Sequence, residues 1–128
     1  MCVRQENLRV LLVDDQDDVL NMMNLLMQSR SYAVATANSG SKALEVAADF
    51  APHVVVSDIG MPGMDGYEMM SNLRRMDQIS PFKAIALTGY DDAEEQDLAR
   101  IAGYDAHLTK PVDFEHLFDV INRLSRSM

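Results

Sequence analysis

The sequence predicts an α/β fold in which a five-stranded parallel sheet is doubly wound, with helices on both faces. Five short apolar runs alternate with five longer segments whose apolar residues recur three and four positions apart. Strands separated by helices run parallel, because each crossover helix returns the chain to the same end of the sheet. Right-handed crossovers then distribute the helices over both faces. The 128 residues suit one domain, so we expect a single domain over 1–128 with its core from about 8 to 124.

The expected strands are apolar runs of four to six residues, which are too short for typical helices. In chain order they are Leu8–Val13, Tyr32–Ala37, His53–Ser57, Lys83–Leu87 and Ala106–Thr109. Each run is followed by polar or glycine-containing residues and then by a helical pattern. This repeated order of strand, loop and helix supports the α/β prediction along the whole chain.

Each segment that follows a strand has one apolar stripe at helical spacing. The predicted stripes are Val19, Met22, Met23 and Leu26; Leu44, Ala47 and Ala48; Met69, Met70 and Leu73; Leu98 and Ile101; and Phe114, Leu117, Ile121 and Leu124. The fourth helix is expected from about Asp92 to Ala102, with Gly103 following it. Side chains suited to cap the helix starts are Asp17 or Asp18, Ser39, Asp65, Asp91 and Asp113.

Composition and charge exclude several classes of function. Twenty acidic residues against eleven basic ones give a net charge of −9, which disfavours direct binding to nucleic acid or to an anionic membrane. No unbroken apolar run exceeds four residues, and the first residues, MCVRQEN, do not form a signal peptide, so we expect no membrane insertion. The lone Cys2 suits a reducing compartment, and a cytoplasmic location is expected.

Polar side chains stand where four of the five predicted strands end. They are Asp14 and Asp15 after the first strand, Asp58 after the third, Thr88 after the fourth, and Lys110 with Pro111 after the fifth. In open parallel sheets, ligands bind beyond the carboxyl ends of the strands, near the point where the crossovers change face. We therefore expect these residues to gather around one crevice.

The three aspartates indicate a site for a divalent cation. Asp14, Asp15 and Asp58 would repel one another unless a cation neutralised them, and oxygen ligands of this kind suit Mg²⁺. Taken singly, each aspartate has an ordinary explanation as a loop or turn acid. Thr88 alone could be a capping hydroxyl, and Lys110 alone could be half of an ion pair. Taken together, a carboxylate nucleophile, a metal pair, a hydroxyl and an ammonium are what phosphoryl transfer needs.

Four segments, LLVDDQDDV, VVVSDIGMPGMDGYE, ALTGY and HLTKPVD, resemble the receiver domains of two-component response regulators. The resemblance covers about Leu8 to Leu124 and implies the flavodoxin-like (βα)5 sandwich with strand order 2-1-3-4-5. It further implies that Asp58 is the phosphoacceptor. Asp15 would be a direct Mg²⁺ ligand, Asp14 would hold the ion largely through water, and the backbone carbonyl of Gly60 would complete the set.

The same resemblance assigns roles to the later strands. Thr88 would bind a phosphoryl oxygen, and Lys110 would pair with Asp58 or the phosphoryl group and precede a cis bond to Pro111. His107 stands where the family usually has a switch aromatic and would act with Thr88. Gly60 and Tyr90 replace polar residues that are common in the family, which predicts a long-lived aspartyl phosphate.

The implied function is a signalling switch rather than a metabolic enzyme. A sensor histidine kinase or a histidine phosphotransfer protein would supply the phosphoryl group, as the likeness to receivers of hybrid sensor histidine kinases suggests. A downstream protein would bind the face made by the fourth helix, fifth strand and fifth helix.

Two alternatives remain at this point. The run from Asp15 to Leu20 is similar to the strand-one signature of haloacid-dehalogenase-type phosphohydrolases, with Asp15 as their nucleophile. The last helix follows Lys110 directly, which leaves no further strand for that family's second acidic pair. The other alternative is an interaction domain that does not depend on phosphorylation.

Overall fold

Strands and helices alternate throughout the part of the chain that the structure describes, residues 8–77, 79, 81–89 and 93–127 of a computed structural model. The strands are β1 (Arg9–Val13), β2 (Ala33–Ala37), β3 (Val54–Asp58), β4 (Lys83–Thr88) and β5 (Ala106–Thr109). The helices are α1 (Asp17–Ser29), α2 (Gly40–Phe50), α3 (Gly66–Arg74), α4 (Ala93–Ala102) and α5 (Phe114–Arg126). Every predicted strand is present, and its ends differ from the prediction by at most one residue.

The five strands form one parallel sheet in the order β2-β1-β3-β4-β5, which confirms the predicted fold class and strand order. β1 lies between β2 and β3, so that Leu11 is opposite both Ala35 and Val55. The chain first crosses from β1 to β2 and then moves in the other direction along the sheet, from β3 to β5. The carboxyl ends of β1 and β3 therefore flank the point where the winding reverses.

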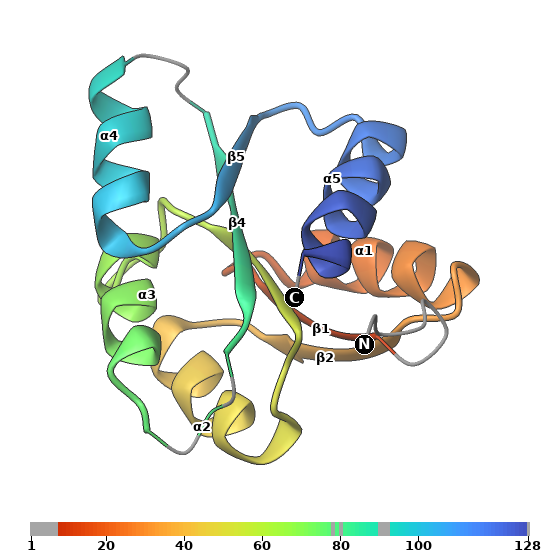
Figure 1. The fold of residues 1–128 in the computed structure, drawn as a ribbon, viewed down its shortest axis with the longest axis horizontal. Coiled ribbons are helices and arrows are strands. Elements are labelled where there is room, and N and C mark those ends of the chain that lie inside the picture. The colour runs from red at the N-terminus through yellow and green to blue at the C-terminus, as the bar shows by residue number, and fades with distance from the viewer. Residues whose placement is uncertain (1–7, 78, 80, 90–92, 128) are drawn as a thin grey trace.

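Helices cover both faces of this sheet, with α1 and α5 on one face and α2, α3 and α4 on the other (Figure 1). Because strand side chains alternate in direction, Leu11 and Val55 pack in the layer of α2, α3 and α4, whereas Leu12 and Val56 pack in the layer of α1 and α5. All five residues of β3 are buried. Because β3 is covered by protein on both faces, the position of its last residue, Asp58, is fixed.

Side chains cap three helices as predicted. Ser39 accepts a hydrogen bond from the backbone N–H of Lys42, and Asp65 accepts one from Glu68. At α5, Asp113 accepts from the backbone N–H groups of Glu115 and His116.

The cap prediction for the first helix is wrong. Gln16 occupies the cap position without a side-chain cap bond, and Asp17 and Asp18 lie inside the first turn, where their negative charge favours the helix dipole. The aspartate predicted to cap the fourth helix, Asp91, lies outside the described residues.

The predicted inner face of the fourth helix is also wrong. Leu98 and Ile101 are 42% and 74% exposed, and Ala99 and Ala102 are buried instead. A shift of one residue turns the inward direction by about 100° around a helix. Two alanines bring α4 close to the sheet, while the larger apolar side chains point outward. In the first two helices the predicted stripes are too wide, because Met22 and Ala48 are exposed, whereas Met23 and Ala47 are buried as predicted.

Within the described residues, no helix is both long enough and apolar enough to cross a membrane.

Candidate functional site

The strand-end residues singled out in the sequence lie at one edge of the sheet. Asp58 and Thr88 are the last residues of β3 and β4, and Asp14 and Lys110 follow β1 and β5 directly. The backbone N–H of Asp14 still donates to Ala37, at 3.2 Å, so this aspartate continues the pairing of β1 with β2. The sheet itself therefore sets the positions of these side chains.

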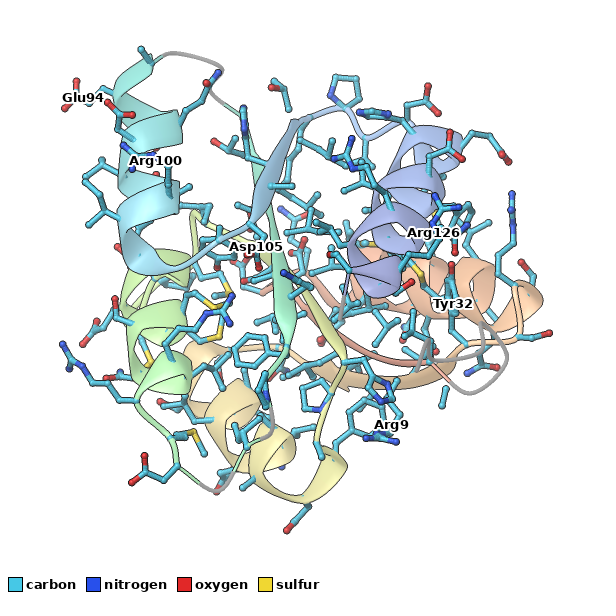
Figure 2. The ribbon with its side chains drawn as sticks, viewed as in Figure 1. Arg9, Tyr32, Glu94, Arg100, Asp105 and Arg126 are labelled. Atoms are coloured by element: carbon cyan, nitrogen blue, oxygen red, sulfur yellow. The ribbon has the colours of Figure 1, made fainter. Side chains whose placement is uncertain are left out.

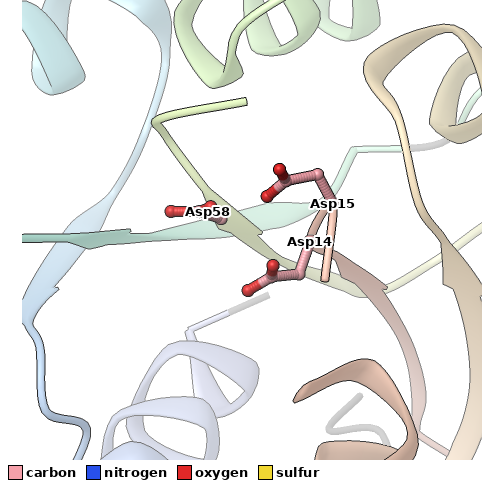
Figure 3. Close-up of side chains that lie close together, drawn as sticks. All are labelled: Asp14, Asp15 and Asp58. Atoms are coloured by element: carbon pink, nitrogen blue, oxygen red, sulfur yellow. The ribbon is translucent and has the colours of Figure 1, made fainter. Parts of the chain in front are cut away.

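Three carboxylates converge at this edge. One oxygen from each of Asp14, Asp15 and Asp58 lies within 4.8 Å of the others, and in Figure 3 the three side chains point to the same side. Asp14 and Asp58 are only 3% and 7% exposed, whereas Asp15 is exposed. Burial is the main cause that raises the pKa of Asp14, and the nearby Asp58 raises it further, although the backbone N–H of Gln16, 2.9 Å from Oδ1, opposes the shift.

A lysine ammonium lies on the other side of Asp58. The Lys110 Nζ is 2.9 Å from the Asp58 Oδ1, and the Lys110 side chain remains 39% exposed. The backbone N–H of Lys110 donates to the carbonyl of Thr88 at 2.7 Å, which joins the two strand ends. The peptide bond from Lys110 to Pro111 is cis, as the family resemblance implied.

The loop after Asp58 folds closely against the acceptor strand. The backbone N–H of Ile59 donates to Leu87, and the Ile59 carbonyl accepts from the N–H groups of Met61 and Gly66. A Cβ at Gly66 would lie 2.6 Å from the backbone oxygen of Asp58, so only glycine lets the start of α3 approach so closely. Gly60 is exposed, and a Cβ there would have no atom within 4 Å.

A pocket of about 560 Å³ opens above these residues. It is lined by Asp15, Gln16, Asp58, Ile59, Gly60, Met61, Asp65, Tyr67, Thr88, Gly89, Glu95 and Lys110. Tyr67 and Glu95 are among the lining residues that were not predicted as site residues. The hydroxyl of Tyr67 donates a hydrogen bond to Glu95 across the gap between α3 and α4. No strand-end position marks either residue, because each enters from the first turn of a helix.

One other residue of the family pattern, His107, lies elsewhere. The side chain of His107 is half-buried and lines a separate pocket of about 220 Å³ between α4 and β5, together with Tyr104 and Arg100. Tyr90 lies outside the described residues.

The family model described as "Response regulator receiver domain" matches residues 10–122. The chain belongs to the response regulator receiver domain family, the receivers of two-component signalling.

Individual relatives agree with this assignment. The chemotaxis protein CheY4 of Vibrio cholerae has a similar structure, with a TM-score of 0.87 and 30% identity over 92% of this chain and 98% of that chain. Sporulation initiation phosphotransferase F of Bacillus subtilis is 26% identical over 91% of this chain and 93% of that protein. The regulatory protein AtoC of Escherichia coli is 33% identical over 90% of this chain, which spans 24% of that protein.

Proposed function

We propose that this receiver domain accepts a phosphoryl group on Asp58 from a phosphohistidine of a sensor histidine kinase or a histidine phosphotransfer protein. The observation that carries this proposal is the position of Asp58, between a pair of aspartates and the Lys110 ammonium at 2.9 Å. The phosphohydrolase alternative has less support, because Lys110 pairs with Asp58 and not with Asp15, its required nucleophile. The described chain also has no strand after β5. We therefore propose a phosphoacceptor and not a metabolic enzyme.

The carboxylates fit a Mg²⁺ ion. The donor set contains only oxygen, and burial raises the pKa of Asp14 although the Gln16 N–H and the Lys110 charge lower it, so the protein compensates its negative charge only in part. We propose that Asp15 and Asp58 bind the ion directly, together with the backbone carbonyl of Gly60, and that Asp14 holds it largely through water. When bound, the ion would offset the negative charge of the attacking carboxylate and of the phosphoryl oxygens.

The protein groups then have distinct tasks. A carboxylate oxygen of Asp58 attacks phosphorus, the P–N bond to the donor histidine breaks, and the electron pair leaves with the imidazole nitrogen. The Lys110 ammonium is already next to Asp58 and would donate to a phosphoryl oxygen, as would the Thr88 hydroxyl. We propose that Thr88 moves toward the phosphoryl group and that His107 responds to this movement, as the switch pair.

The exposed surface of α4 supports a protein partner on the face of α4, β5 and α5. Ile101 and Leu98 are exposed on α4, and two apolar side chains of this size three positions apart favour contact with another protein. The net charge of −9 supports a protein rather than nucleic acid as the direct partner. We propose that the receiver is a single domain over residues 1–128.

Phosphorylation with acetyl phosphate and Mg²⁺ tests the proposal. The expected result is one added phosphoryl group by intact mass, mapped to Asp58 and absent in Asp58→Asn. Asp119→Asn, a change of the same kind on the exposed surface of α5, should keep the modification. Phosphate on Asp15, or turnover of small phosphate esters, would support the phosphohydrolase instead.

A further inference from the structure

The first turns of α3 and α4 are joined directly at the acceptor pocket. Tyr67, the second residue of α3, donates its hydroxyl hydrogen bond to Glu95, the third residue of α4. We call this hydrogen bond the α3–α4 tether. Both side chains are partly buried, so the bond is shielded from water more than one on an open surface.

The tether lies in the pocket where the phosphoryl group would be added. Tyr67 and Glu95 line the same pocket as Asp58, Thr88 and Lys110. Tyr67 also follows Gly66, whose close packing on the backbone of Asp58 fixes the start of α3 relative to the acceptor. One end of the tether is therefore held by the acceptor strand, and the other end belongs to α4.

The charges around the pocket make Glu95 sensitive to phosphorylation. Among its lining residues as described, Asp15, Asp58, Asp65 and Glu95 carry negative charge, and the ammonium of Lys110 is already paired with Asp58. An aspartyl phosphate carries about one negative charge more than the carboxylate it replaces, since a phosphoryl group brings roughly −1.5 to −2 at neutral pH. The added charge repels the carboxylate of Glu95, which lines the same pocket.

We propose that the α3–α4 tether holds α4 in its unphosphorylated position and that repulsion between the phosphoryl group and Glu95 breaks it. This inference rests on the proposed function and adds a second connection from Asp58 to α4, separate from Thr88 and His107. Tyr67 and Glu95 act as positioning residues for α4. Because coupling is reciprocal, a bond that favours the unphosphorylated state must also weaken the binding of a phosphoryl mimic.

Two variants separate the bond from the charge. Tyr67→Phe keeps the ring and removes the donor, whereas Glu95→Gln keeps an oxygen acceptor for Tyr67 and removes the charge. Each protein is titrated with beryllium trifluoride, a stable phosphoryl mimic, in the presence of Mg²⁺. The amide chemical shifts of Ala93–Ala102 and the affinity for the mimic are measured together.

In Tyr67→Phe without the mimic, we expect the α4 shifts to move toward those of the mimic-bound wild type. In Glu95→Gln, we expect the mimic to bind with a smaller α4 response than in the wild type. Both variants should bind the mimic about fivefold more tightly, the lower end of common allosteric coupling. Glu94→Gln is the matched control, because Glu94 is exposed on the outer side of α4 (Figure 2) and does not line the pocket.

The outcomes distinguish the tether from the proposed function. If the wild type binds the mimic and Tyr67→Phe keeps wild-type α4 shifts and affinity, the tether is refuted and the phosphoacceptor function stands. The tether is also refuted if Glu94→Gln reproduces the effects of Glu95→Gln, because net charge would then explain them. A folded wild type that binds no mimic would refute the proposed function, and with it the tether.

Discussion

The backbone N–H of Arg9 donates to Nδ1 of His53 at 2.9 Å and joins the start of β1 to the segment before β3. Arg9 also donates from its side chain to the carbonyl of Ala51, at 2.8 Å. The nitrogen of His53 can accept this bond only while it carries no proton. Burial, followed by the positive charge of Arg9, lowers the pKa of His53 below its ordinary 6.5.

This contact predicts an acid-sensitive loss of stability. Because the folded-state pKa of His53 is lowered, the unfolded chain binds the proton first as the pH falls. The stability contributed by neutral His53 is complete above about pH 6.5 and is lost between that pH and the folded-state pKa. We expect the free energy of unfolding in urea to fall between about pH 7.5 and about pH 5.5. This fall should be larger in wild type than in His53→Asn by about 1 kcal/mol, the size of one hydrogen bond. In His116→Asn, on the exposed surface of α5, the free energy of unfolding should fall as much as in wild type. Equal falls in all three proteins would contradict the prediction.

Asp14→Asn should stabilise the protein in metal-free buffer. Burial raises the pKa of Asp14, so at neutral pH its charged form costs free energy that an uncharged amide avoids, and the Asn oxygen still accepts the N–H of Gln16. We expect the free energy of unfolding to rise by about 1 kcal/mol, a typical size for a single-site effect. Added Mg²⁺ should narrow the difference, because it stabilises the wild type more. A less stable variant in chelator would show that the charge of Asp14 is compensated within the protein.

Substitutions of the two neighbouring aspartates, Asp14 and Asp15, should lower the Mg²⁺ affinity by different amounts. Asp15→Asn removes a proposed direct ligand, whereas Asp14→Asn removes a carboxylate that we expect to act largely through water. Calorimetric titration should therefore show the larger loss of affinity for Asp15→Asn. Equal losses would mean that both carboxylates contact the ion in the same way.

Lys110→Ala should impair signal transmission more than folding. The lysine side chain is 39% exposed, and ion pairs this close to solvent contribute up to about 1 kcal/mol to stability. We expect a small change in the circular-dichroism melt and a much reduced chemical-shift response to beryllium trifluoride. A large fall in melting temperature with an unchanged response would reverse this assignment.

Gly66→Ala should destabilise the protein by about 1–3 kcal/mol, the usual cost of overpacking. The new Cβ would lie 2.6 Å from the Asp58 backbone oxygen and 2.8 Å from the Ile59 Cα. Gly60→Ala is the matched change in the loop before α3 and should alter stability by less than about 0.5 kcal/mol, because no atom lies within 4 Å of its Cβ. Similar denaturation midpoints for the two variants would show that the loop moves to accommodate the added methyl group without cost.

The fold and the strand-end residues were predictable from sequence for a common reason. Parallel strands bring their carboxyl ends to one edge, so the positions of Asp14, Asp58 and Lys110 follow from where their strands end. The predicted proximity of the three aspartates and the cis bond before Pro111 are present in the structure. Their chemical roles stay predictions until phosphorylation and metal binding are measured.

Features that depend on helix rotation and on contacts between helices were not predictable in this way. The apolar pattern of α4 favours Leu98 and Ile101 as inward residues, but the close approach that Ala99 and Ala102 allow decides the packing. The contact between Tyr67 and Glu95 depends on the distance between the starts of two helices, and local sequence does not contain that distance.

The sheet order divides the acceptor site into two halves on either side of β3. Asp14 and Asp15 extend from β1 on one side, and Thr88 and Lys110 extend from β4 and β5 on the other. Under the proposed function, substitutions beside β1 act on the metal-dependent chemistry, whereas substitutions beside β4 and β5 act both on the chemistry and on the surface that a partner protein would bind. In duplicated copies of the domain, we therefore expect changes beside β1 to alter the reaction rate without altering the partner surface, whereas changes of partner beside β4 and β5 would alter the rate as well.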